Sequence, residues 1–114
     1  MITINEFTQI AQSFHDVKQH PHHHQIIAFK VRSKIFCTLN PPKNRACVKL
    51  GVVDQYTFCQ FDESIIYPVP NKFSKHGWTL INLEKINHEM LLDALTAAYC
   101  NVAPASLSKL YLNF

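Results

Sequence analysis

Basic residues along one acid-free stretch are the side chains of this chain with the clearest capacity for chemistry. Between Asp16 and Asp54 there is no acidic residue, while lysines and arginines recur throughout. Lys and Arg without competing carboxylates are the groups that bind the phosphate oxygens of nucleic acids. The candidate phosphate-binding residues, here and in a second basic segment, are Lys30, Arg32, Lys34, Lys43, Arg45, Lys49, Lys72 and Lys75. The alternative is a solvated surface that only keeps the protein soluble.

Histidines form a second cluster, His20-Pro21-His22-His23-His24. Pro21 favours an extended backbone at His20, and an extended segment projects His20, His22 and His24 to one side. Three imidazoles on one side are able to bind a transition metal. No carboxylate or cysteine lies nearby in the sequence to complete a site. We therefore expect only adventitious metal binding, and no resident metal or other cofactor.

Signatures of catalysis are missing from the sequence. The serines lie outside any G-x-S-x-G motif, and two glycines are too few for a glycine-rich phosphate-binding loop. His76, beside Lys75 in an expected loop, is most simply a surface residue. The four cysteines lack C-x-x-C spacing and sit within apolar runs, so we expect them to be reduced and buried. The sequence therefore predicts a protein without enzymatic activity.

The length of 114 residues suffices for one domain, spanning residues 1–114, and not for two. The sequence has no apolar run of about 18 residues, the length that a membrane-spanning helix needs. Its first residues do not have the pattern of a signal peptide. We therefore expect a cytoplasmic protein that does not span a membrane.

Three short apolar runs between Ile26 and Leu50 predict an antiparallel meander that carries most of the basic residues. Apolar residues alternate with polar ones in the first and third runs, as in a sheet with one covered face and one open face. The residues expected on the covered face include Phe29, Val31, Val48 and Leu50. Those expected on the open face or its rim are Lys30, Arg32, Arg45 and Lys49. The middle run alternates less regularly, and residues 40–44 after it are expected to form a rigid basic loop.

Helices are expected to cover one face of this sheet. Thr3 and Glu6 have the spacing of a capping box, which predicts a helix over about residues 4–14. We expect a second helix over residues 51–61, and a third that starts after Asn87 and ends before Pro104. Residues 15–25 are expected to be a polar connection. Residues 65–67 and 78–83 are expected strands, joined by an ordered loop that Trp78 anchors in the core. The predicted order is α-β-β-β-α-β-β-α, which indicates an α+β two-layer sandwich with helices on one face of an antiparallel sheet.

Several segments, in the right order, resemble the YjbR/MmcQ family. They are Ala28-Phe29-Lys30-Val31 with Lys34-Ile35-Phe36-Cys37-Thr38-Leu39, Asp54-Gln55 followed by Phe58-Cys59, the helix 91–99, and the most specific one, Tyr67-Pro68-Val69-Pro70-Asn71-Lys72-Phe73 running to Gly77-Trp78-Thr79. Phe73 stands where members commonly carry Trp, and the residues after Pro21 depart from the Pro-His-aromatic pattern of the family. The resemblance implies a secretion-chaperone-like or CyaY-like topology, a double-wing arrangement and a bacterial DNA-binding protein. It brings no catalytic residues.

Two classes of partner remain open. Double-stranded DNA would be bound weakly and without sequence preference, because no recognition helix for base edges is evident. A protein or peptide partner could instead add a strand to an exposed sheet edge. A basic and polar open face favours DNA, whereas a contiguous apolar patch favours a protein partner.

Overall fold

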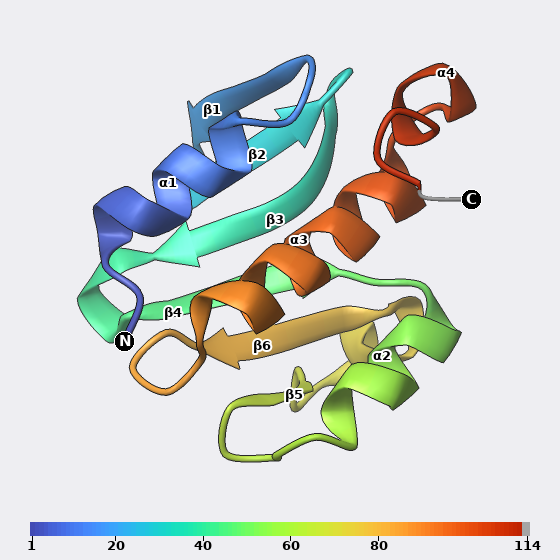
Figure 1. The fold of residues 1–114 in the computed structure, drawn as a ribbon. Coiled ribbons are helices and arrows are strands. Elements are labelled where there is room, and N and C mark those ends of the chain that lie inside the picture. Colours follow the sequence, from blue (N-terminus) through green and yellow to red (C-terminus); the bar gives the residue numbers. More distant parts are fainter. Residues whose placement is uncertain (113–114) are drawn as a thin grey trace.

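The computed structural model describes residues 1–112 and places a six-stranded antiparallel sheet behind a layer of helices (Figure 1). The elements are α1 (Ile4–Gln12), β1 (Val17–Pro21), β2 (Ile27–Val31), β3 (Lys34–Asn40), β4 (Arg45–Lys49), α2 (Val52–Cys59), β5 (Ile66–Pro68), β6 (Trp78–Asn82), α3 (His88–Val102) and α4 (Ala105–Ser108). The strand order is β1-β2-β3-β4-β6-β5. The α+β class is confirmed, with the predicted sequence of helix, meander, helix, two strands and helix. No helix within residues 1–112 is long and apolar enough to cross a bilayer.

One strand, β1, lies in the segment that we expected to be a polar connection. It pairs antiparallel with β2, from Val17 opposite Val31 to Pro21 opposite Ile27. Because β1 is at the edge of the sheet and four of its five residues are exposed, it has no alternating apolar pattern to reveal it. Pro21 suits this position, since an edge strand can accommodate a residue without a backbone N–H. The expected polar connection, residues 15–25, therefore contains an edge strand of the sheet.

The covered face of the sheet forms the core together with α1 and α3. Phe29 and Val48 are completely buried, and Val31 and Leu50 are nearly so, which confirms the expected alternation. Phe7 of α1 packs edge-to-face on Phe29, with ring centroids 5.8 Å apart. Helix α3 lies across β3 and β4 on this same face (Figure 1). The helices thus occupy one side and leave the other side of the sheet open.

A bulge in β3 explains the irregular alternation of the middle strand. Phe29 lies opposite Cys37, but the next residue, Lys30, lies opposite Ile35. Phe36 is therefore the extra residue, and Phe36 and Cys37 are both completely buried. A bulge places two successive residues against one residue of the neighbouring strand. As a result, Ile35 shares the open face with Lys30.

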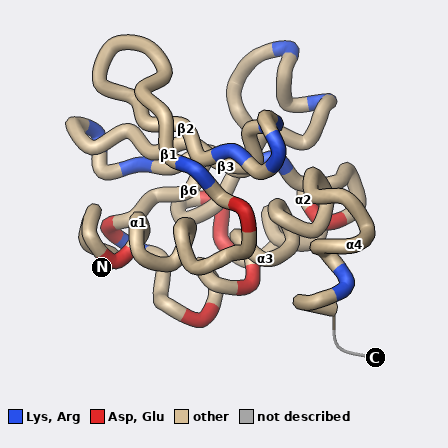
Figure 2. The backbone as a smooth tube through the Cα atoms, turned by 90° about the horizontal axis from the view of Figure 1, so that it is seen from above, with Lys and Arg blue, Asp and Glu red and all other residues tan. Residues whose placement is uncertain are grey.

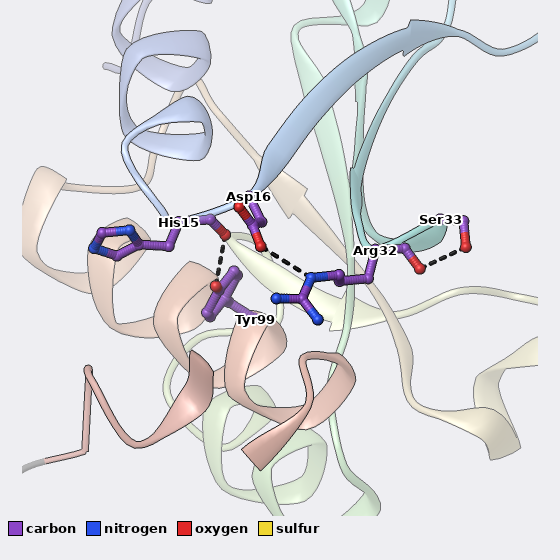
Figure 3. A network of polar contacts seen from close by, with 5 residues as sticks. All are labelled: His15, Asp16, Arg32, Ser33 and Tyr99. Carbon is purple, nitrogen blue, oxygen red and sulfur yellow. Dashed lines mark hydrogen bonds and ion pairs between the residues drawn. The ribbon is translucent and has the colours of Figure 1, made fainter. Parts of the chain in front are cut away.

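A buried tyrosine holds the connection between α1 and β1 (Figure 3). The hydroxyl of Tyr99 donates a hydrogen bond to the carbonyl of His15 at 2.7 Å, and the His15 amide donates to the Tyr111 hydroxyl at 2.9 Å. Phe14 stacks on Tyr99 with ring centroids 4.8 Å apart. Burial, aided by the nearby Tyr111 and Asp16, raises the pKa of Tyr99 to about 12. The C-terminal part of the chain thereby fixes the start of β1.

Candidate functional site

The open face of the sheet carries three rows of side chains. Read from β1 towards β6, the rows are Lys18, Lys30 and Ile35; His20, Ala28, Thr38, Cys47 and Leu80; and Asn40, Arg45 and Asn82. Lys49 lies opposite Trp78, near the end of the sheet that carries the first row. None of these positions on the described strands is acidic. Cations therefore flank a central row that holds mostly short side chains and no lysine, arginine or carboxylate.

The charges of the whole chain separate between the two layers (Figure 2). Lys and Arg gather on the side of the open face, while Asp and Glu lie mainly on the side of the helices. A net charge of +3 thus understates the positive character of this face, because the negative charges are elsewhere. The expected basic open face is present.

Lys18 and Lys30 line a hollow at one end of the open face, together with Arg32 and its partner Asp16. The two lysines lie directly opposite each other on β1 and β2. Like charges on directly opposed residues repel, so the pair lowers the stability of the sheet when no anion is near. The sequence reasoning missed Lys18 as a site residue, because its position depends on β1. The only signal in the sequence was that Lys18 lies within the acid-free stretch.

Arg32 was expected to be a cation without a nearby carboxylate, but it forms an ion pair with Asp16. Its Nε lies 2.9 Å from Oδ2 of Asp16, and both side chains are about half exposed (Figure 3). Arg32 and Ser33 form the two-residue turn between β2 and β3, with φ angles of 49° and 69°. Lys34 lies opposite Val31, whose side chain enters the core, so Lys34 is on the helix side of this turn. The fold thus withdraws Lys34 from the open face, whereas Arg32 stays at its rim, where it lines a hollow with Lys18 and Lys30 and is paired with Asp16.

The basic loop between β3 and β4 is a compact 3-10 turn, Pro41–Lys43. Asn44 closes it with a φ of 48° and donates its side-chain amide to the Glu84 carboxylate at 2.6 Å. Lys43 is exposed on this turn, and Arg45 starts β4 with its side chain on the open face. These two cations therefore lie at the opposite end of the sheet from Lys30 and Lys49.

Two loops rise on the open-face side, one from each half of the sheet (Figure 2). The first, here called the histidine loop, comprises residues 22–26 between β1 and β2. It is closed by hydrogen bonds from the His22 amide to the Ile26 carbonyl and from the Ile26 amide to the His23 carbonyl, at 2.9 and 3.1 Å. The rings of His22 and His23 are 4.6 Å apart. Within residues 1–112 no three His, Cys, Asp or Glu side chains are arranged to hold a metal ion. Adventitious metal binding by the histidines stays a prediction.

The second loop, here called the Lys72 loop, comprises residues 69–77 between β5 and β6. It contains a 3-10 turn, Lys72–His76, which Asn71 caps by accepting a hydrogen bond from the Phe73 amide at 2.9 Å. Gln55 of α2 donates to the carbonyls of Ser74 and Trp78 at 3.0 and 3.2 Å. The loop is therefore tied to both the helix and the sheet, in agreement with the ordered loop predicted here.

Trp78 does not anchor the Lys72 loop in the core, contrary to the expectation. It lies opposite Lys49 on the open face and is partly exposed, whereas the next residue, Thr79, is completely buried. The reason is the two-residue period of a strand, which sends successive side chains to opposite faces. The indole therefore belongs to the open face and not to the hydrophobic core.

The two loops enclose a groove of about 520 Å³ over the middle of the open face. Its floor is formed by Ile35, Thr38 and Cys47, and its walls include His22 and His23 on one side and Phe73 and Trp78 on the other. Two cations lie against the aromatic wall. The Nζ of Lys49 is 5.6 Å from the centre of the Trp78 ring, and the Nζ of Lys72 is 5.6 Å from that of Phe73. The open face therefore combines an apolar groove with a basic rim.

The floor of the groove carries no charge at neutral pH. Burial raises the pKa of the Cys47 thiol to about 11, although a hydrogen bond with the Thr79 backbone and the charge of Arg45 oppose the shift. A thiol becomes a strong nucleophile or metal ligand only as the thiolate. Cys47 thus serves as a small apolar surface, as expected for a reduced cysteine.

Comparison with known proteins places the chain in a family. Residues 12–101 match the family model YjbR. The crystal structure of Deinococcus radiodurans protein DR2400, described as a DUF419 domain, superposes with a TM-score of 0.79 over 96% of this chain and 87% of that chain. The two sequences are 18% identical, so this likeness shows the shared fold alone. No curated protein matches the chain. The family match extends over most of the residues, and the chain belongs to the YjbR family.

Proposed function

We propose that this protein binds DNA weakly and without sequence preference, through the open face of the sheet and the Lys72 loop. The observation that carries the proposal is the set of cations on a face whose described strand positions hold no carboxylate, while Asp16 at its rim is already paired with Arg32 (Figure 2). Among residues 1–112 the single ion pair is that of Arg32 with Asp16. The cations left without a carboxylate partner on this side are Lys18, Lys30, Arg45, Lys49, Lys72 and Lys75.

The Lys18–Lys30 pair adds a physical reason for anion binding. Two ammonium groups on opposed residues repel each other, and a phosphate between them converts that repulsion into two attractions. Binding of phosphate also releases counterions from the nucleic acid, which is the main source of non-specific affinity. This pair is therefore the expected centre of phosphate contact.

We expect no sequence preference because of the position of the helices. Helices α1 and α3 pack on the covered face, so they are turned away from a ligand on the open face. Lysine ammonium groups contact phosphates and carry no information on base identity. We expect a dissociation constant on the order of 10⁻⁴ to 10⁻⁶ M at physiological salt, the usual range for such binding.

Fluorescence anisotropy with labelled random-sequence duplex DNA, at several salt concentrations, tests the proposal. About four to six phosphate contacts give a log–log salt slope of roughly −4 to −5. The double variant Lys18→Gln, Lys30→Gln should flatten this slope by about two units and weaken binding to every sequence alike. The charge-matched control is Lys85→Gln, Lys109→Gln, which changes exposed lysines outside the sheet and should leave the slope unchanged. Absence of binding at low salt by the folded protein would overturn the proposal.

An extended peptide is the second candidate ligand, because the groove is apolar and exposes half of the Phe73 side chain. Edge strand β1 also offers unpaired backbone groups for an added strand. Apolar and backbone contacts are screened by salt far less than contacts to phosphate. The salt titration therefore separates the two candidates.

A further inference from the structure

We propose that the groove between the histidine loop and the Lys72 loop takes unpaired nucleotides, so that the preferred ligand is single-stranded nucleic acid. This inference rests on the proposed DNA-binding function and specifies which form of DNA the face accepts. Bases enter the groove, and the phosphates that join them lie on its basic rim.

The floor of the groove selects against phosphate. Ile35, Thr38 and the protonated thiol of Cys47 offer no charge to a bound group. Moving a phosphate from water onto such a surface, without a compensating cation, is strongly unfavourable. A nucleobase is uncharged and flat, and it gains from covering apolar surface. The part of a nucleic acid that reaches the floor is therefore an uncharged one, and a flat base gains the most from covering this apolar surface.

The walls of the groove include four ring side chains beside Ile26, Val69 and Asn71. Phe73, which is 51% exposed, and the partly exposed Trp78 line one side of the groove, and His22 and His23 line the other side. Aromatic side chains are the surfaces on which proteins stack unpaired bases without regard to sequence. In a duplex the base faces are already stacked on each other, so they cannot use these walls. Unpaired bases of a single strand can therefore stack on these walls, whereas the paired bases of a duplex cannot.

Cations stand where the phosphates between stacked bases would pass. Lys72 and Lys49 each lie 5.6 Å from the centre of an aromatic wall residue, and Lys30 lies opposite Ile35 of the floor. Arg45 stands at the other end, two residues before Cys47 on β4. A groove of about 520 Å³ is within the range of about 300–1,000 Å³ common for small-molecule sites. Aromatic walls with cations beside them are the combination that non-specific single-strand binding requires.

The chain contains its own reporter for this site, because Trp78 is its only tryptophan and lines the groove. We would titrate the protein with oligothymidylate of about 15 nucleotides, within the usual site sizes of single-strand binding domains. The same titration would use duplex DNA of equal length. The single strand should quench Trp78 fluorescence and bind at least about fivefold more tightly than the duplex, since stacking of one base contributes about 1–3 kcal/mol.

Phe73→Ala is the decisive variant, and Phe61→Ala is its matched control. Phe61 is 63% exposed and follows α2, so both substitutions remove a surface ring and neither opens the core. Phe73→Ala should weaken single-strand binding about 5- to 150-fold, the equivalent of one lost stacking contact. It should weaken duplex binding much less, because a duplex contacts the cations of the Lys72 loop and does not stack on the Phe73 ring. Phe61→Ala should change neither. Circular dichroism would confirm that both variants are folded.

The outcomes distinguish this inference from the function on which it rests. If duplex DNA binds as well as the single strand, and Phe73→Ala changes neither or both equally, the groove does not take bases, while the proposed DNA-binding function stands. If neither form of DNA binds the folded protein at low salt, both proposals are wrong. In that case an extended peptide becomes the leading candidate ligand of the groove.

Discussion

Replacing Gly77 with alanine tests how the Lys72 loop is held against the sheet. Gly77 ends this loop with a φ of 91°. A Cβ atom added there would lie 1.8 Å from the Leu50 carbonyl oxygen and 2.9 Å from the Leu50 carbonyl carbon. The Leu50 amide also donates a hydrogen bond to the Gly77 carbonyl at 3.0 Å. The two backbone segments therefore cannot move apart without losing that bond.

The expected loss of stability has two parts. An L-residue in the left-handed region costs about 1–2 kcal/mol relative to glycine. Relief of the overlap by shifting packed backbone costs about 1–3 kcal/mol more. The free energy of unfolding should therefore fall by about 2–5 kcal/mol, a large share of the roughly 5–15 kcal/mol typical of a domain. In a urea titration with an m-value of about 1.5 kcal/mol per M, the midpoint should fall by about 1–3 M.

Gly51→Ala is the matched control, since it changes the only other glycine of the chain. Gly51 caps α2 with a φ of −68°, and a Cβ there would meet only Oδ1 of Asn101, at an ordinary contact distance of 3.5 Å. This substitution should lower the free energy of unfolding by no more than about 1 kcal/mol. The loss arises because alanine is a poorer N-cap than glycine, and no steric overlap adds to it. An equal or smaller loss for Gly77→Ala than for Gly51→Ala would refute the reasoning. It would show that the backbone of the loop adjusts freely.

Three other properties can be checked on the same purified protein. Trp78→Ala should destabilise the fold by less than the roughly 3–5 kcal/mol of a fully buried aromatic residue, because the indole is partly exposed; a larger loss in a denaturant titration would contradict this. Stability should fall as the pH rises above 10.0, since Tyr99 ionises in the unfolded chain while its pKa in the folded state is about 12, and urea titrations of Tyr99→Phe should lack this part of the decline. A chelator should leave the melting temperature unchanged, because we expect only adventitious metal on His20, His22 and His24; a clear drop would reveal a structural metal.

Local patterns predicted much of the fold because they are complete within a few residues. Thr3 and Glu6 form both hydrogen bonds of the predicted capping box, at 3.1 and 3.3 Å. Asn87 caps α3 by accepting a hydrogen bond from the Met90 amide at 2.8 Å. In β2 and β4 the two-residue alternation identified the buried face correctly, because one face of each strand is covered by helices and the other is open.

Part of the candidate site could also be predicted from sequence. The alternation that buries Val48 also sends Lys49 to the open face, and the Pro-rich segment before Gly77 indicated an ordered loop. The sequence could not show that this loop faces the histidine loop across a groove. Residues 22–26 and 69–77 are far apart in the chain, and only the sheet between them brings them to the same side.

The sequence by itself thus determined the α+β class, the caps of the helices and the faces of the strands. Tertiary structure decided which charges are free and which surfaces are apolar. Edge strand β1 pairs through backbone hydrogen bonds that impose no apolar pattern, so the opposition of Lys18 and Lys30 left no local signal. Asp16 reaches Arg32 because β1 and β2 pair. Ile35 faces the groove because the bulge at Phe36 shifts the register of β3 by one residue. These contacts join residues through the geometry of the sheet, which no short stretch of sequence contains.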